Sequence, residues 1–161
     1  MSVLKKKEGM DVPDRKIILL PADQCRTVLV IINKAEQIRH NQLHQLFPKA
    51  IFTFLTVRSE KKDNSSGQNF TFHKSDIRFG RVKNERLKDL MAIDFDLLID
   101  LSEHPKLARF STKLIAHLRA GTFDKTHNYN FDLLVKNSTA IEEIINTIAK
   151  QLNLLTLNKN T

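Results

Sequence analysis

Continuous apolar runs alternate with amphipathic segments along most of this chain. The runs at 27–33 and 50–57 are rich in β-branched and aromatic residues, and a third run, at 96–102, places Leu97, Leu98 and Ile99 between two aspartates. Strands of a parallel sheet are covered by helices on both faces, so they read as unbroken apolar stretches instead of alternating ones. We therefore expect buried parallel strands in these three segments, with shorter strands at 69–77 and 132–136.

Between the strands, amphipathic segments indicate helices. The first follows Asn33, whose side chain would cap it together with Glu36, and it ends before Pro48. Its apolar positions recur at helical spacing, which gives it one face for the core. A second, shorter helix is expected at 84–91.

Two further helices complete the pattern. One begins at Pro105, in a first-turn position that tolerates proline, and ends at Gly121. Its inner face consists of apolar residues at helical spacing: Leu107, Phe110, Leu114, Ile115 and Leu118. The other has a capping box at its start, formed by Thr139 and Glu142. Both helices follow a predicted strand, as the helices of βα units do.

This alternation of strands and helices predicts an α/β fold. We expect a three-layer sandwich, Rossmann-like in architecture, with a mostly parallel sheet of about five strands flanked by helices. A single α/β domain would span residues 16–157, a length that suits one hydrophobic core. Residues 1–15 mix lysines with acidic residues and lack periodicity, so we expect a flexible basic N-terminal arm. The polar stretch at 58–68 is expected to be a surface loop.

Composition predicts a soluble, cytoplasmic protein without a membrane partner. Of the 161 residues, 41% are hydrophobic and 27% charged, and no apolar run approaches the length of a membrane span. Charged residues interrupt the N-terminus where a secretory signal needs an apolar stretch. The single cysteine, Cys25, cannot form an internal disulfide. We expect an ordinary core or surface thiol, and the neighbouring Arg26 leaves a thiol of lowered pKa as the alternative.

The formal net charge of +8 raises the question of nucleic-acid binding. Beyond the N-terminal arm, one basic cluster comprises Arg78, Arg81, Lys83, Arg86 and Lys88. We expect it to present no aromatic side chains of the kind that stack on bases, and no recognisable nucleic-acid-binding signature accompanies it. Solvated surface is therefore the preferred interpretation, and weak RNA binding is the alternative.

The motifs of common cofactor and metal sites are missing. The turn after the first strand, at 33–36, contains no glycine, which disfavours a dinucleotide site, and no phosphate-binding loop sequence is present. His40 and His44 have the spacing of zinc ligands, but Asn41 stands where a metalloprotease has its glutamate. We therefore predict no cofactor and no metal, with both histidines on an exposed helix face.

Polar side chains at the ends of two predicted strands mark the candidate site. Asn33 ends one strand, and Asp100, Ser102, Glu103 and His104 end or follow another. Ligands of parallel sheets bind where strands give way to helices, so these five residues are the predicted ligand-binding set. Asp100, Glu103 and His104 could instead converge as acid, base and orienting group of an enzyme. Helix capping by Ser102 or His104 explains the same residues by folding alone and is preferred, so no residue is assigned a catalytic role.

Two segments carry a resemblance to known families. Phe95-Asp-Leu-Leu-Ile-Asp-Leu-Ser102, followed by a helix closing on Ala120-Gly121 and by Tyr129-Asn-Phe-Asp-Leu-Leu-Val135, resembles a family of short bacterial proteins with a domain of unknown function. This resemblance extends over 27–155. The first segment is also distantly similar to the N-terminal half of heptosyltransferase-like glycosyltransferases, which implies a Rossmann-like fold. Those enzymes hold the activated sugar mainly through a second domain, for which this chain has no room.

These observations predict a non-catalytic cytoplasmic α/β module that binds a protein or a small ligand at the C-terminal ends of its strands. The alternative functions are a reduced glycosyltransferase-like enzyme and weak RNA binding through the basic cluster. A membrane and a nucleic acid are not the expected partners.

Overall fold

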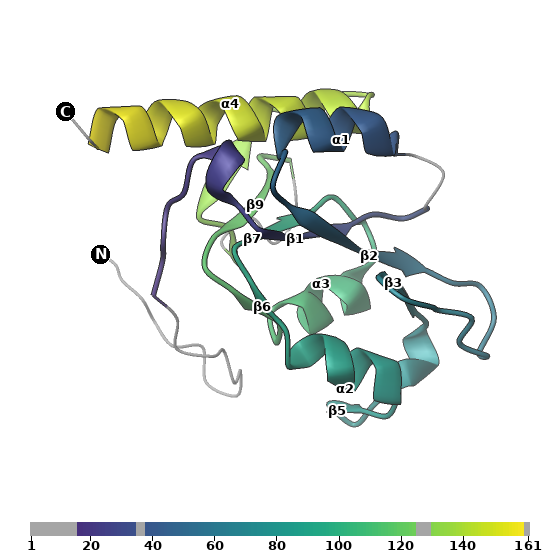
Figure 1. Cartoon of the computed structure of the whole chain (residues 1–161). Coiled ribbons are helices and arrows are strands. Elements are labelled where there is room, and N and C mark those ends of the chain that lie inside the picture. The colour runs from purple at the N-terminus through teal and green to yellow at the C-terminus, as the bar shows by residue number, and fades with distance from the viewer. Residues whose placement is uncertain (1–15, 35–37, 125–129, 160–161) are drawn as a thin grey trace.

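The computed structural model describes residues 16–34, 38–124 and 130–159 (Figure 1). The predicted N-terminal arm and Glu36 lie outside these ranges. The strands are β1 (Thr27–Ile31), β2 (Ile51–Val57), β3 (Asn69–Phe72), β4 (Ile77–Arg78), β5 (Arg81–Val82), β6 (Asp94–Phe95), β7 (Leu97–Asp100), β8 (Ile115–Ala116), β9 (Arg119–Thr122) and β10 (Leu133–Val135). The helices are α1 (His40–Leu46), α2 (Glu85–Met91), α3 (Pro105–Ser111) and α4 (Ile141–Lys159), with short 3₁₀ turns η1 (Ala22–Gln24) and η3 (Lys74–Asp76).

A six-stranded sheet in the order β10-β9-β7-β1-β2-β3 forms the centre of the fold, and all of its neighbouring strands are parallel. The chain starts in the middle at β1 and builds outward through β2 and β3. It then returns to the other side of β1 and continues through β7, β9 and β10. The direction in which successive strands are added to the sheet therefore reverses between β1 and β7.

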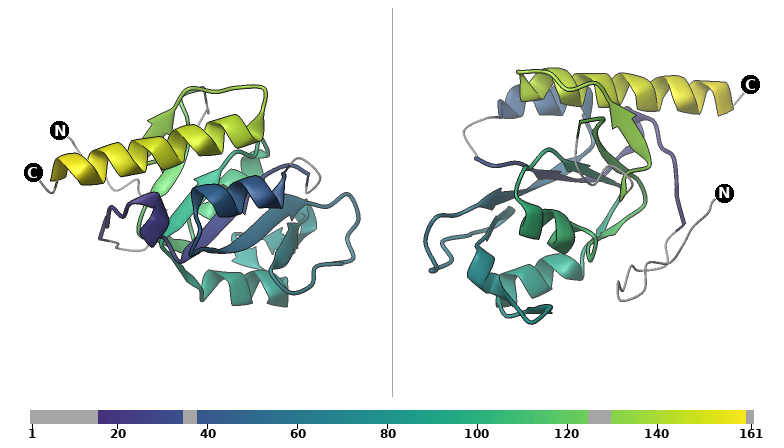
Figure 2. Two further views of the ribbon diagram at one scale, coloured as in Figure 1. Left: turned by 45° about the horizontal axis from the view of Figure 1, so that its top comes forward. Right: turned by 180° about the vertical axis from the view of Figure 1, so that it is seen from behind.

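Helices cover both faces of this sheet. α1 and α4 lie on one face, whereas α2 and α3 lie on the other (Figures 1 and 2). Alternate residues of β1 supply the two cores: Val28 and Val30 pack on the α1 and α4 side, and Leu29 and Ile31 pack on the α2 and α3 side. All four side chains are fully buried, which explains why this strand reads as a continuous apolar run. Among the described helices, none is long and apolar enough to span a membrane.

The prediction of a helix from Pro105 to Gly121 is wrong in its second half. α3 ends at Ser111, and the chain then forms β8 and β9. Arg119 explains the change, because it is buried in β9 and its guanidinium donates to the carbonyl oxygens of Ser111 and Leu114. The side chain thus satisfies carbonyl groups at and just beyond the end of α3, which a continuous helix would have paired internally.

Two helix starts also differ from prediction. Asn33 does not cap α1, which begins at His40, and its Oδ1 accepts a hydrogen bond from the Glu103 amide at 3.2 Å. α4 begins two residues after Thr139, so the predicted cap at Thr139 is wrong. A polar contact near this start instead joins the Ser138 hydroxyl to the Glu143 carboxylate at 2.5 Å.

The segment between β2 and α2 forms a small lobe that contains β3, η3 and the β4–β5 hairpin. The predicted surface loop contains a buried arginine, Arg58, whose guanidinium pairs with Asp76 at 2.6 and 2.7 Å. The strand predicted at 69–77 ends at Phe72, because the chain turns through η3 before the short antiparallel hairpin of β4 and β5. Asp63 holds the loop against β3 and the start of α2 by accepting hydrogen bonds from Thr71 at 3.0 Å and Asn84 at 2.7 Å.

Candidate functional site

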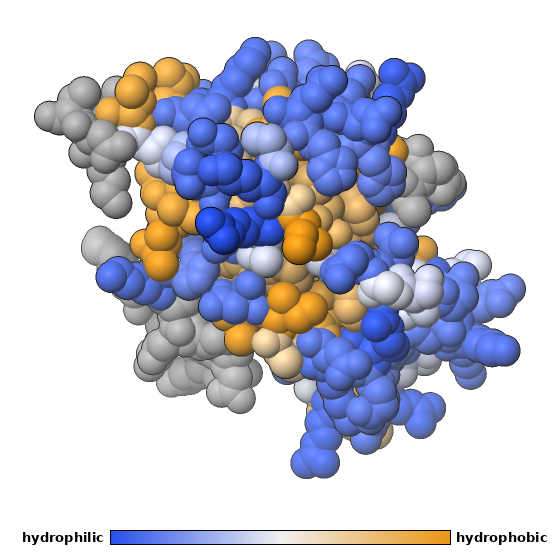
Figure 3. Space-filling view, viewed as in Figure 1, coloured by the Kyte–Doolittle hydropathy of each residue, from blue (hydrophilic) through white to orange (hydrophobic). Residues whose placement is uncertain are grey.

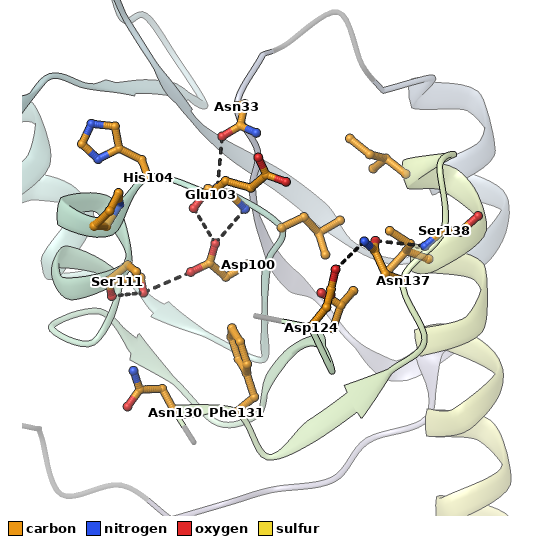
Figure 4. A pocket seen from close by; sticks show the side chains of 17 residues that line it. Asn33, Asp100, Glu103, His104, Ser111, Asp124, Asn130, Phe131, Asn137 and Ser138 are labelled. Atoms are coloured by element: carbon orange, nitrogen blue, oxygen red, sulfur yellow. Dashed lines mark hydrogen bonds between the residues drawn. The ribbon is translucent and has the colours of Figure 1, made fainter. Parts of the chain in front are cut away.

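A cavity of about 490 Å³ opens at the carboxyl ends of β1, β7, β9 and β10, between α3 and the start of α4 (Figure 4). All five residues predicted to bind a ligand line it: Asn33, Asp100, Ser102, Glu103 and His104. The strand order reverses between the neighbouring strands β1 and β7, and the cavity lies at the carboxyl ends of these two strands. The topology therefore brings together side chains about 70 residues apart in the sequence.

Asp100 organises the turn that leaves β7. Its Oδ1 accepts hydrogen bonds from the amide and the hydroxyl of Ser102, at 3.0 and 2.8 Å, and its Oδ2 lies 3.3 Å from the Ser111 hydroxyl. Asp100, Ser102 and Ser111 are each only 3% exposed. These hydrogen bonds fix the carboxyl group at the inner wall of the cavity.

His104 acts as the N-cap of α3. Its Nδ1 accepts from the Leu107 amide at 3.4 Å, Pro105 takes the first helical position, and the imidazole packs edge-on against Phe72. The capping interpretation is therefore confirmed. In Figure 4 the His104 ring stands apart from the other labelled side chains, whereas Glu103 is exposed and its backbone is held by Asn33.

Several lining residues were missed by the sequence analysis. They come from the ends of β9 and β10 and from the segment before β10: Thr122, Asp124, Asn130, Phe131, Asn137 and Ser138. The amide of Asn137 donates to the Asp124 carboxylate at 2.7 Å, so the ends of β9 and β10 are joined across the sheet edge. The strand-end rule that indicated Asn33 and Asp100 also applies to Asn137 and Ser138, after the strand predicted at 132–136, and it would have indicated Thr122 and Asp124 had β9 been recognised as a strand.

The ring of Phe131 lies directly on Gly121 of β9. A Cβ atom at position 121 would come within 2.5 to 2.7 Å of three carbon atoms of that ring, a distance that real Cβ contacts essentially never show. Glycine at this position therefore allows the half-buried ring to occupy its place in the cavity wall. Gly121 is part of a strand here and does not end a helix as predicted.

The two other chemical candidates of the sequence have structural roles. His40 and His44 are both exposed on α1, where their rings meet Phe54 and Phe52 edge-on. In the described part of the chain, no three His, Cys, Asp or Glu side chains gather as they would around a metal ion. Cys25 is a buried core residue, and burial, reinforced by Asp96 and Asp23, raises the pKa of its thiol to about 12. The alternative of a lowered pKa is wrong.

The predicted basic cluster divides into two parts. Arg86 and Lys88, on α2, are engaged with the protein: Arg86 stacks over the Phe70 ring at 4.1 Å and donates to Ser65, and Lys88 pairs with Glu85. Arg78, Arg81 and Lys83 are exposed on or beside the β4–β5 hairpin. The hairpin also carries a fully exposed phenylalanine, Phe79, so the expectation that the cluster presents no such aromatic is wrong.

Comparisons with curated proteins and with solved structures found no match. A comparison with protein families did: the model of DUF6913, described as a family of unknown function, matches residues 4–155. This match covers nearly all of the described sheet and helices, including every residue that lines the cavity. Because the match spans most of its length, the chain belongs to the family of unknown function DUF6913.

Proposed function

We propose that this chain is a Rossmann-like, three-layer binding module that takes a small polar molecule in the cavity at its strand ends. The observation that carries the proposal is the position of the cavity. In open α/β sheets, ligands bind outside the carboxyl ends of the strands at the point where the strand order reverses. Here that point lies between β1 and β7, and the cavity volume of about 490 Å³ suits a small ligand.

The polar groups of the cavity wall favour one class of ligand over another. The lining includes three carboxylates, those of Asp100, Glu103 and Asp124, together with amide and hydroxyl groups. Among the described residues that line the cavity, none is a lysine or an arginine. A phosphate would find no lysine or arginine among the described lining residues, whereas hydroxyl or ammonium groups would find acceptors. We therefore favour a neutral polyhydroxylated molecule or a small amine over a nucleotide.

Binding has more support than catalysis. Asp100 is held by two serines, and the Nδ1 atom of His104 accepts from the backbone of α3. A general acid or base must reach the proton that it transfers, and these two side chains are instead directed to the fold. The glycosyltransferase alternative stays a prediction from resemblance alone.

A thermal-shift experiment tests the proposal with glucose, adenosine, spermidine and adenosine monophosphate, each at millimolar concentration. We expect glucose, adenosine or spermidine to raise the Tm, since a ligand at about 100 times its Kd adds about 2.7 kcal/mol to the free energy of unfolding. Adenosine monophosphate should have a smaller effect than adenosine. Glu103→Gln should weaken the stabilisation, and Glu60→Gln, an equivalent change at an exposed position in the loop after β2, should not.

Three results would count against the proposal. A larger shift with the monophosphate than with adenosine would contradict the charge argument. Equal shifts in the Glu103→Gln variant and the wild type would place binding elsewhere. The absence of any shift with all four probes would contradict binding of these ligand classes.

A further inference from the structure

The tip of the β4–β5 hairpin has an unusual residue in an unusual conformation. Ile77 pairs with Val82 and Arg78 with Arg81, which leaves Phe79 and Gly80 as the two-residue turn. Both have positive φ, 52° for Phe79 and 76° for Gly80. Positive φ at both central positions is the mark of a type I′ turn, which strongly favours Asn-Gly or Gly-Gly.

Neither folding nor packing explains a phenylalanine at this position. The left-handed conformation is unfavourable for a bulky side chain, and asparagine would adopt it more readily. The Phe79 ring is fully exposed, so it gains no burial in return. Phe79 adopts an unfavourable backbone conformation, and no contact within the fold compensates for it. A contact with another molecule explains such a residue best.

Cationic side chains gather around this hairpin, and all of them are exposed except the half-buried Lys113. Lys74, Arg78, Arg81 and Lys83 lie on η3 and the hairpin, and Lys106, Arg109 and Lys113 recur at helical spacing along and just after α3. The Nζ of Lys113 donates to the Gly80 carbonyl at 3.4 Å and that of Lys106 to the Lys74 carbonyl at 3.5 Å. These contacts join the two groups into one surface, which we call the basic face.

Few negative charges offset the basic face. Asp76 is the one acidic residue in 74–84, and it is buried against Arg58, while 105–113 contains none. The nearby Glu85 pairs with Lys88. In Figure 3 the region over α2 and the hairpin is mostly hydrophilic on the visible side.

We propose that the basic face binds single-stranded nucleic acid, with Phe79 stacked on a base and the surrounding cations on the phosphates. An exposed ring among arginines matches the way proteins bind single strands without reading their sequence. A lipid surface fits less well, because one phenylalanine ringed by charges offers little apolar area for insertion. The cavity at the strand ends is not involved, so this proposal is independent of the proposed function.

Fluorescence anisotropy with a labelled single-stranded RNA, the DNA of the same sequence and the corresponding duplex tests the proposal. The wild type should bind both single strands more tightly than the duplex, whose bases are already stacked. Phe79→Asn should weaken binding at least fivefold, which corresponds to about 1 kcal/mol, while its Tm stays the same or rises. The paired change Arg78→Gln with Arg81→Gln should weaken binding and reduce the slope of log K against log salt by roughly 1.4.

A matched control removes two exposed cations from the opposite side of the sheet, through Lys49→Gln with Lys150→Gln. This variant should bind like the wild type. The proposal is overturned if neither single strand binds, if the duplex binds equally well, or if the control loses as much affinity as the Arg78 and Arg81 variant. It is also overturned if Phe79→Asn binds normally or unfolds, or if vesicles containing phosphatidylserine bind and the oligonucleotides do not.

Discussion

The buried pair of Arg58 and Asp76 supports a quantitative prediction about stability. Their side chains are only 5% and 7% exposed, and two hydrogen bonds of 2.6 and 2.7 Å join them. Arg58 also donates to the carbonyl oxygens of Thr71 and Lys61, at 3.0 and 2.8 Å. One arginine therefore connects the end of β2, the loop after it, β3 and η3.

Removing either partner should be strongly destabilising, and removing both should cost less than the sum of the two single changes. In Arg58→Met, Asp76 keeps its 2.8 Å hydrogen bond from the His73 amide but loses two bonds to a charged donor. Each such bond contributes roughly 1.5 to 3 kcal/mol, and a buried charge left without its partner typically costs about 3 to 5 kcal/mol. We expect a loss in that range for Arg58→Met and for Asp76→Leu. The double variant should lose less than the sum, with a coupling energy of about 2 kcal/mol.

Urea unfolding followed by circular dichroism measures all four proteins of this cycle. The exposed pair of Lys88 and Glu85 on α2, 3.0 Å apart with side chains 49% and 82% exposed, provides the control. Its cycle should give a coupling energy below about 0.5 kcal/mol. A loss under about 1 kcal/mol for either Arg58→Met or Asp76→Leu, or a coupling energy near that of the control, would refute the reasoning, because it would show that water screens the pair.

Two further predictions concern titratable groups. Cys25 should resist a thiol-specific reagent at about pH 8 in the folded protein and react once urea unfolds the chain, because burial raises the pKa of its thiol to about 12; rapid labelling of the folded protein would contradict this. Asp63→Asn should lower the free energy of unfolding at neutral pH, because an amide cannot accept all the hydrogen bonds that the carboxylate receives from Ser65, Thr71 and Asn84. Partial burial opposes ionisation of Asp63, but these hydrogen bonds prevail and lower its pKa to about 2, so its stabilisation is complete above the unfolded pKa of about 3.9 and disappears as the pH falls through 2. Urea titrations over this range should show the difference between variant and wild type shrinking toward low pH, and a constant difference would contradict the assignment.

The sequence predicted the central strands well because burial on both faces leaves a clear pattern. The prediction failed after Ser111 because two hydrophobic periodicities overlap there. Leu107, Phe110 and Leu114 have the spacing of a helix, whereas Ala116, Leu118 and Ala120 alternate as in a strand. The deciding contact, from Arg119 back to the end of α3, is tertiary and leaves no local signal. For the same reason, the burial of Arg58 depends on a partner 18 residues away.

The candidate site was predicted in part. Asp100, Ser102, Glu103 and His104 form a contiguous segment at a strand end, which local rules identify. The role of Asn33 depends on a backbone amide 70 residues away, so the sequence placed it correctly but gave it the wrong partner. Asp124 was missed because the strand before it was predicted as a helix, whereas Asn137 follows the strand predicted at 132–136 and was overlooked.

The contact between Gly121 and Phe131 makes the shape of the cavity depend on a residue outside its lining. Position 121 does not line the cavity, yet any side chain there must displace a ring that does. A single methyl group added at position 121 would thus reshape the cavity without changing the identity of any lining residue. The size of the acceptable ligand would then be adjusted from inside the sheet, at a position that no inventory of lining residues would include.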